Sequence, residues 1–131
     1  MSEEIEYNQL KILMECKGDL TDPNKYVKDL KNLSEKIESN PEFKKIIKIN
    51  KSISERNRLL ILELLRENEE MCICELTFAL DLSQQTISHH LQKLEDAKLI
   101  EGIKSGKFIH YRLKKTNIKN YLEIFKKFIK D

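Results

Sequence analysis

Two groups of side chains in this sequence could do chemistry: polar residues between positions 83 and 93, and a pair of thiols shortly before them. A helix that advances about 100° per residue places Ile87, Leu91 and Leu94 on one side of residues 83–94. The opposite side carries amides, hydroxyls and an imidazole but no carboxylate. Such groups suit hydrogen bonding to base edges and phosphates in a major groove. An ordinary amphipathic surface helix is the alternative.

The elements that must position this polar face are typical of a helix-turn-helix. Residues 72–80 read as a short apolar helix, and Asp81, Leu82 and Ser83 form a three-residue joint after it. Ser83 is a natural N-cap, so the polar face begins at a helix N-terminus, which favours phosphate. The candidate DNA contacts on the second helix are Ser83, Gln84, Gln85, Thr86, Ser88, His89, Gln92 and Lys93.

A basic β-hairpin is expected directly after this helix. Residues 99–103 and 108–113 are β-type runs joined by residues 104–107, whose Ser-Gly pair suits a hairpin tip. In the second run Ile109, Tyr111 and Leu113 should point inward, and Phe108, His110 and Arg112 outward. Residues 104–115 contain no acid and five basic residues. The hairpin is therefore predicted to be the wing of a winged helix-turn-helix, with Lys104, Lys107 and Arg112 along the phosphate backbone.

The thiol pair, Cys72 and Cys74, opens the first helix of the helix-turn-helix. A helix N-terminus favours the thiolate, the form of cysteine that binds soft metal ions. However, Cys-x-Cys is not the Cys-x₂-Cys spacing of structural zinc sites, and two thiolates leave an ion short of ligands. Two small packed side chains are the alternative, since free cysteine packs well. The spacing alone leaves both interpretations open.

The whole chain is expected to be mostly α with a small β-hairpin. Its 131 residues carry 24 basic and 22 acidic residues, so the charge is informative only where it is concentrated, in the basic wing. The sequence predicts helices over residues 3–16 and 23–39, another from Pro41, and one that runs to about Glu67 after a capping box at residues 52–55. Thr116 should cap the last helix. The predicted division is an N-terminal helical extension (1–51), the winged helix-turn-helix (52–115) and a C-terminal helix (116–131).

The last helix has a wide apolar stripe of Ile118, Tyr121, Leu122, Phe125, Phe128 and Ile129. It could complete the core or pair with its copy in a second subunit. Because helix-turn-helix proteins usually bind two half-sites as dimers, dimerisation is favoured. The first 50 residues pose the same choice. The polar start and the lack of a long apolar run predict a cytoplasmic protein without a membrane partner, and its cysteines should be free thiols or metal ligands.

Residues 54–115 resemble the ArsR/SmtB (arsenic-repressor) family of winged-helix transcriptional repressors. The resemblance is carried by Arg58-Leu59-Leu60-Ile61-Leu62, Cys72-Ile73-Cys74-Glu75-Leu76, residues 82–91, and Gly-Lys-Phe-Ile-His-Tyr-Arg-Leu from 106 to 113. It implies a homodimer that represses a promoter and releases DNA when a metal or metalloid binds. The effector would be arsenite, antimonite, cadmium, lead or zinc, with Cys72 and Cys74 as two ligands, and no cofactor would be needed for folding.

Two departures from the family pattern affect this interpretation. Arsenic sensors with a third cysteine on the same helix would place it at position 77, which is Thr77 here. Residues 117–130 contain no histidine, unlike the zinc-sensing branch. Some cadmium and lead sensors complete the site from an N-terminal extension, and Cys16 lies in such an extension. Cys16 is therefore either a third ligand or a packing residue.

The sequence predicts a dimeric DNA-binding repressor that leaves an imperfect palindromic operator when a thiophilic ion binds. One rival is a metal-independent winged-helix regulator with inert or redox-responsive cysteines. Another is a protein-binding winged helix, which is disfavoured because such a module would expose apolar or acidic residues on the face described above. An enzyme is not expected, because no nucleophile–base pair or open zinc constellation is present.

Overall fold

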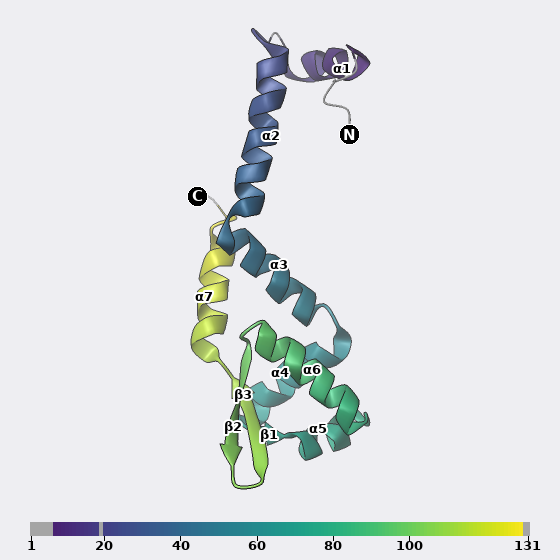
Figure 1. Ribbon diagram of the computed structural model, residues 1–131, viewed down its shortest axis with the longest axis vertical. Coiled ribbons are helices and arrows are strands. Elements are labelled where there is room, and N and C mark those ends of the chain that lie inside the picture. The colour runs from purple at the N-terminus through teal and green to yellow at the C-terminus, as the bar shows by residue number, and fades with distance from the viewer. Residues whose placement is uncertain (1–6, 19, 130–131) are drawn as a thin grey trace. The chain divides into compact units, whose positions relative to one another are not determined.

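The computed structural model describes residues 7–18 and 20–129, which form two compact units that meet between Asn40 and Pro41 (Figure 1). The start of the first predicted helix, residues 3–6, lies outside the described residues. Among the described helices, none is long and apolar enough to cross a membrane.

The first unit contains two helices, α1 (Tyr7–Lys17) and α2 (Pro23–Ser39). The Asp22 carboxylate accepts a hydrogen bond from the Lys25 N–H at 3.1 Å, and Pro23 occupies the first helical position. This start and the end at Ser39 confirm the prediction for α2. Neither helix contains a buried residue. The described part of this unit therefore has no core of its own.

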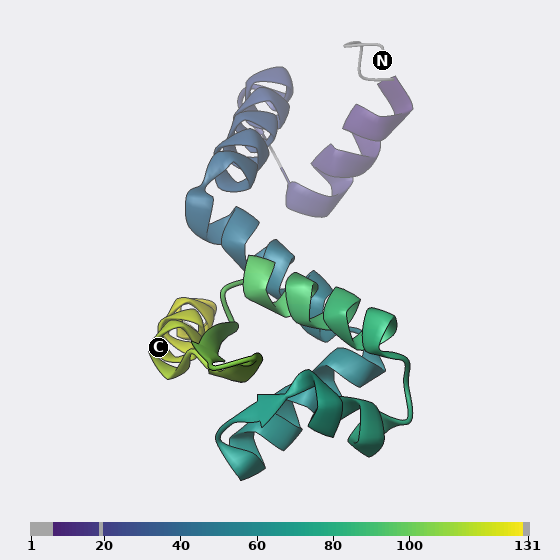
Figure 2. The same cartoon turned by 60° about the horizontal axis from the view of Figure 1, so that its bottom comes forward.

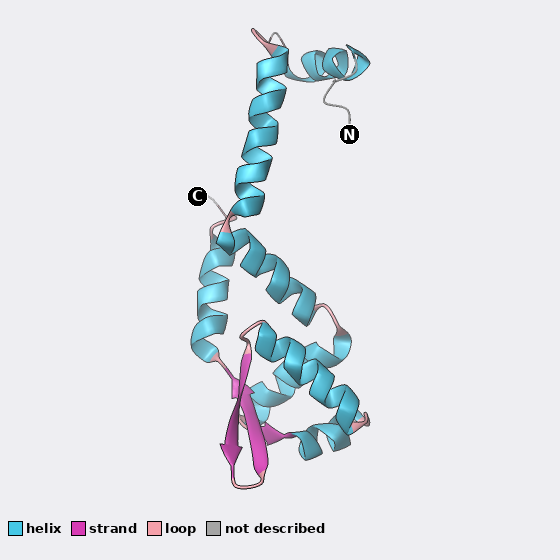
Figure 3. Cartoon of the chain, viewed as in Figure 1, coloured by secondary structure: helices cyan, strands magenta, loops and turns pink. Residues whose placement is uncertain are grey.

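The second unit holds five helices and a three-stranded sheet (Figure 3). The helices are α3 (Pro41–Ile53), α4 (Arg56–Asn68), α5 (Ile73–Leu80), α6 (Gln84–Asp96) and α7 (Lys115–Lys126). The strands are β1 (Met71–Cys72), β2 (Ile100–Ser105) and β3 (Phe108–Leu113), in the antiparallel order β1-β3-β2. The unit is thus mostly helical with a small hairpin sheet, as the sequence predicts.

A single core joins these elements. Its fully buried side chains come from α4, α5, α6 and β2: Ile61, Leu65, Leu76, Ile87, Leu91, Leu94 and Ile100. Ile49 of α3 and Tyr121 of α7 are also buried, and the Tyr121 hydroxyl donates to Asn50 Oδ1 at 2.7 Å. Figure 2 shows α6 lying over α4 and α5. The core therefore fixes α6 by one face and leaves its other face free.

The predicted capping box at residues 52–55 is wrong. Helix α3 continues to Ile53, and the Ser52 hydroxyl donates to the Ile49 carbonyl at 2.9 Å within that helix. The cap of α4 is Glu55, whose carboxylate accepts from the Arg58 N–H at 2.9 Å. Ser52 cannot cap α4 because it is already a buried part of the preceding helix.

Three details at the sheet and at α7 differ from the sequence prediction. Helix α7 begins at Lys115 with Lys114 as its N-cap, so Thr116 does not cap it. Strand β1 was not expected, because a strand of only two residues has no alternation to detect. Ile109 was expected inward but is 44% exposed, since the hairpin tip extends past the core, whereas Tyr111 is buried as predicted.

The predicted division into an extension, a winged helix-turn-helix and a C-terminal helix assigns a role to each part, and it stays a prediction. By contacts, α3 belongs to the second unit, where Ile49 and Ser52 are buried. The structural boundary therefore precedes α3, although the sequence analysis assigned most of this helix to the extension.

Candidate DNA interface and thiol cavity

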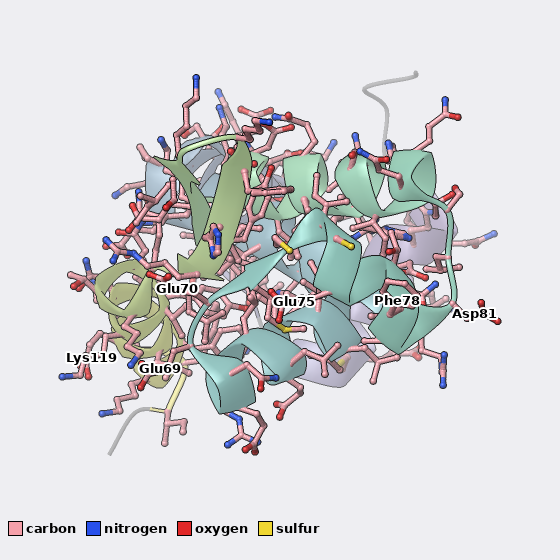
Figure 4. All side chains as sticks on the ribbon, turned by 90° about the horizontal axis from the view of Figure 1, so that it is seen from below. Glu69, Glu70, Glu75, Phe78, Asp81 and Lys119 are labelled. Carbon is pink, nitrogen blue, oxygen red and sulfur yellow. The ribbon has the colours of Figure 1, made fainter. Side chains whose placement is uncertain are left out.

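Helices α5 and α6 and the joint between them form the predicted helix-turn-helix. Asp81, which follows α5, has the left-handed backbone conformation (φ 55°) that turns the chain sharply. The Ser83 hydroxyl then accepts from the Thr86 N–H at 3.2 Å, so Ser83 is the N-cap of α6 as predicted. In Figure 4, Glu75, Phe78 and Asp81 mark the course of α5 toward this joint.

The outward face of α6 is exposed along its length. Ile87, His90, Leu91 and Leu94 are buried, while the exposed residues of the predicted contact set are Ser83, Gln84, Gln85, Ser88, His89, Gln92 and Lys93. Thr86 is half-buried, and its hydroxyl is 2.8 Å from that of Ser83. The Gln92 amide donates to Asp96 at 3.0 Å. Thr86 and Gln92 are therefore partly engaged within α6, and Gln85, Ser88 and His89 are the freest groups on this face.

A polar network behind α6 was not anticipated from the sequence. Arg58 donates to the carbonyls of Ser52 and Lys51 and lies 3.3 Å, through Nη1, from His90 Nδ1. Arginine can only donate, so Nδ1 is the acceptor where this contact is a hydrogen bond, and Glu55 Oε2 lies 3.7 Å from the same nitrogen. Burial lowers the pKa of His90, and Arg58 and His89 lower it further against the opposing effect of Glu55. The network joins the end of α3, the start of α4 and α6, and the sequence does not distinguish Arg58 from Arg56 and Arg66 of the same helix.

The predicted wing presents cations of two kinds. Lys104 and Lys107 are exposed and have no ion-pair partner among the described residues. Arg112 is also exposed, but its Nε lies 2.8 Å from the Glu101 carboxylate on the neighbouring strand. The charge of Arg112 is thus partly balanced within the sheet, whereas the charges of the two lysines are not.

The two thiols flank the start of α5. Cys72 is its N-cap, half-buried on β1, and it lies opposite His110 of β3 in the sheet; Cys74 is exposed in the first turn. The Cys72 N–H donates to the Glu75 carboxylate at 3.0 Å. Hydrogen bonds from the backbone and then the thiol of Cys72 hold the pKa of the Glu75 carboxyl below its ordinary value. Cys72 and Glu75 therefore form the two ends of the cap that begins α5.

Both thiols line a cavity of about 510 Å³ that reaches the predicted DNA-binding elements. Its lining is Cys72, Ile73, Cys74, Thr77, Gln84, Lys107, Phe108 and Ile109. These residues come from the start of α5, the start of α6 and the tip of the wing. Soft sulfur donors are suitable ligands for a thiophilic ion, but the described residues hold no group of three or more metal-binding side chains. Cys16, the third predicted ligand, is exposed on α1 of the first unit.

The chain shares this arrangement with known regulators. The family described as "Bacterial regulatory protein, arsR family" matches residues 55–101. The uncharacterized HTH-type transcriptional regulator MJ1325 of Methanocaldococcus jannaschii is 34% identical over 83 residues, which are 63% of this chain and 93% of that protein. The chain belongs to the ArsR family of helix-turn-helix transcriptional regulators, as the sequence motifs predict.

Two further relatives carry functional names. The cadmium resistance transcriptional regulatory protein CadC of Listeria innocua is 35% identical over 74 residues, 56% of this chain and 62% of that protein. The arsenical resistance operon repressor of Escherichia coli is 45% identical over 67 residues, 51% of this chain and 57% of that protein. The chain thus spans about three fifths of the length of these relatives. All are regulators rather than enzymes, which agrees with the sequence prediction.

Solved structures confirm the fold. HlyU from Vibrio cholerae matches with a TM-score of 0.57 and 29% identity, over 68% of this chain and 96% of that protein. The winged helix-turn-helix predicted from the polar helix and the basic hairpin is therefore the fold of this protein.

Proposed function

We propose that this protein is a dimeric repressor that binds operator DNA through α6 and the wing and leaves it when a thiophilic ion binds at Cys72 and Cys74. The observation that carries the proposal is the cavity that both thiols share with Gln84 and with the wing tip. A ligand held there would touch the two elements that are expected to contact DNA.

DNA recognition is supported by the division of groups between these two elements. The exposed face of α6 offers amides, hydroxyls and the His89 imidazole, which read base edges. The wing offers Lys104 and Lys107, whose ammonium groups suit phosphates of any sequence. We propose an imperfect palindrome as the operator, because a two-fold dimer presents two copies of α6 to two half-sites.

The thiols would supply two ligands to arsenite, antimonite, cadmium, lead or zinc, and the names of the relatives favour arsenic or cadmium. Thiolate is the ligating form, so ion binding at the two cysteines would release protons. Cys16 is our candidate for a third ligand, because it is the remaining cysteine of the chain. A shift between two arrangements of the wing would then couple the cavity to DNA affinity.

The dimer is supported by the part of α7 that the core leaves uncovered. Ile118 and Tyr121 pack against the core, whereas Leu122, Phe125, Phe128 and Ile129 are exposed. Leu122 and Phe125 lie on α7 and Phe128 and Ile129 directly follow it, and together they are the kind of surface that a second copy would cover.

A binding titration with the intergenic DNA upstream of the gene tests the proposed switch. Adding Cd²⁺ or arsenite to the wild-type protein under reducing conditions should weaken DNA binding about 5–150-fold, the ordinary range of coupling. Cys72→Ser/Cys74→Ser should bind DNA as before and lose this response. Cys16→Ser separates its two roles: weaker ion binding identifies a ligand, and unchanged binding identifies a packing residue. Release of the double serine variant by either ion would contradict the proposal.

A metal-independent regulator is the second candidate, favoured by the lack of a third ligand near the two thiols among the described residues. In that case neither ion changes DNA affinity, while the wild type and the double serine variant bind the operator equally well. Oxidation with a mild disulfide reagent would then decide between redox-responsive and inert cysteines.

A further inference from the structure

Helix α2 carries an apolar stripe of which Tyr26 is half-buried, beside Lys17 of α1, while the other three residues are exposed. The stripe consists of Tyr26, Leu30, Leu33 and Ile37, at intervals of four, three and four residues. Leu30, Leu33 and Ile37 are 45%, 52% and 47% exposed. Apolar residues at this alternating spacing form the a and d positions of a coiled coil. The stripe therefore has the form of a helix–helix seam that lacks its second helix.

The rest of α2 shows that the seam is narrow. Except for the half-buried Val27, the positions away from it are polar, among them Asn24, Lys25, Lys28, Lys31, Asn32, Glu35, Glu38 and Ser39. A helix that lies on a globular core usually needs a wider stripe, of three or four apolar residues in two turns. Two apolar positions in seven are typical of a pair of helices. A single partner helix is therefore the occupant that fits.

The stripe is complementary to itself when a second α2 is turned end for end. A two-fold axis between Lys31 and Asn32 places Tyr26 opposite Ile37 of the second copy and Leu30 opposite Leu33 of the second copy. By symmetry the reverse contacts also form, so all four stripe residues of each helix are covered. A shift of one heptad in either direction leaves stripe residues without a partner. This register is therefore the one that fills the seam.

The charges beside the seam favour the same antiparallel arrangement. Asp29 and Lys36 occupy the g positions that flank the stripe, and neither side chain has a partner among the described residues. The antiparallel register brings Asp29 beside Lys36 of the second copy, and this pair occurs twice. A parallel pair would instead place Asp29 beside Ser34 of the second copy. Only the antiparallel pair matches opposite charges.

We propose that α2 forms an antiparallel two-stranded coiled coil with α2 of a second copy of this chain. This self-interaction lies outside residues 55–101, the segment that the ArsR family shares. A helix of 17 residues is short for an independent coiled coil. A dimer already held through α7 would raise the local concentration of the second α2 and so promote pairing. The coiled coil thus supplies a dimer contact that the winged helix itself does not contain.

Disulfide trapping in the full-length protein tests the pairing and its direction. Tyr26→Cys/Ile37→Cys, in a Cys16→Ser background, should give a covalent dimer in which the new thiol at position 26 is linked to the new thiol at position 37 of the second copy. Cys16 is replaced because it could form a disulfide with the new thiol at position 26. It lies on α1 next to Lys17, whose Nζ is 5.9 Å from the centroid of the Tyr26 ring. The two positions are about 16 Å apart along one helix, so this link cannot form within a chain.

The matched single variant, Tyr26→Cys, should stay uncrosslinked, because the two copies of position 26 would lie about 16 Å apart. A disulfide between the two copies of position 26 would show a parallel pair, and no linkage in the double variant would show no pair; either result overturns the proposal. These readouts do not depend on DNA or ions, so they separate failure of this inference from failure of the proposed repressor function.

Charge reversal provides a second test. Asp29→Lys alone and Lys36→Asp alone should each weaken self-association roughly tenfold, because each creates two like-charge contacts. Asp29→Lys/Lys36→Asp should restore it, since the opposite charges face each other again. Equal effects in the single and double variants would overturn the pairing.

Discussion

At the scale of single residues, we expect base recognition and phosphate binding to fall to different side chains. Gln85 and His89 project from α6, and Lys104 and Lys107 from the wing, all exposed. Amides and imidazoles discriminate among bases by the direction of their hydrogen bonds, whereas an ammonium group attracts every phosphate. Arg112 is less available than the lysines, because Glu101 already accepts from it at 2.8 Å.

Substitution should separate these roles. Gln85→Ala or His89→Ala should cost about 1–3 kcal/mol on the operator and relax base preference. Lys104→Ala or Lys107→Ala should weaken binding to all sequences alike and reduce the salt slope by about one. Binding titrations at several salt concentrations measure both effects. Lys119→Ala, an exposed cation on α7 (Figure 4), is the matched control. Identical behaviour of the α6 and wing variants would contradict the division of roles.

His90 should make folding stability depend on pH. Burial lowers its pKa in the folded protein, so the unfolded chain binds the proton more readily. Its stabilising contribution is therefore complete above about pH 6.5 and is lost as the pH falls below that value. We expect the free energy of unfolding to decrease on going from pH 7.5 to 5.5, by at most about 1.4 kcal/mol per pH unit from this group.

His90→Asn keeps an acceptor for Arg58 and removes the titration. Denaturant melts at both pH values should show a smaller decrease for the variant; an equal decrease would assign the pH dependence to other groups.

At the scale of elements, the hairpin depends on one close approach. Gly102 lies opposite Tyr111, and an added Cβ would meet Ile109 Cγ2 at 2.8 Å and the Tyr111 ring at 3.1 Å. The Ile109 methyl belongs to a β-branched side chain with restricted χ1, so it cannot easily turn away. The path of the wing therefore requires a residue without a Cβ atom at position 102.

Gly102→Ala should therefore destabilise the protein by about 1 kcal/mol or more, the usual cost of overpacking. Because the wing holds Lys104 and Lys107, DNA affinity at low salt should fall with stability. Thermal unfolding and a binding titration measure the two effects. Ser105→Ala, an exposed position on the same strand, should change neither. Wild-type stability of Gly102→Ala would show that the hairpin can open without cost.

At the scale of the whole molecule, α7 both closes the core and leaves an apolar surface. Tyr121 is buried and hydrogen-bonded to Asn50 of α3, and Lys127 pairs with Glu42 at 2.9 Å. Leu122 and Phe128 remain 53% and 66% exposed. Truncation before α7 would open the core as well as remove the surface. Point substitutions are therefore the cleaner test of dimerisation.

Leu122→Asp/Phe128→Asp should weaken the dimer by at least about 2 kcal/mol, as expected for apolar residues central to an interface. The monomer should stay folded, since neither side chain is buried. Sedimentation equilibrium measures the dissociation constant, and circular dichroism checks the fold. Asn120→Asp, on the opposite side of α7, is the control. An unchanged constant would place the interface on other elements.

Several features of this protein follow from local sequence alone. The Asp22-Pro23 and Asn40-Pro41 starts, the three-residue joint at 81–83 and the Ser83 cap each depend on residues within one or two turns, so neighbouring residues suffice to predict them. The buried and exposed faces of α6 follow from helical periodicity in the same way.

Other features depend on residues far apart in the chain, and only the tertiary structure decides them. Ser52 is buried as the end of α3, which rules it out as a cap for α4, and Arg58 reaches His90 across 32 positions. The pairing of β1 with β3 brings Cys72 opposite His110, and the fold brings both thiols into one cavity with Gln84 and Lys107. Periodicity identifies the faces of a helix, but it contains no information about which distant face will cover them. That choice is made by packing, and here it joins the thiols to the DNA-binding surface.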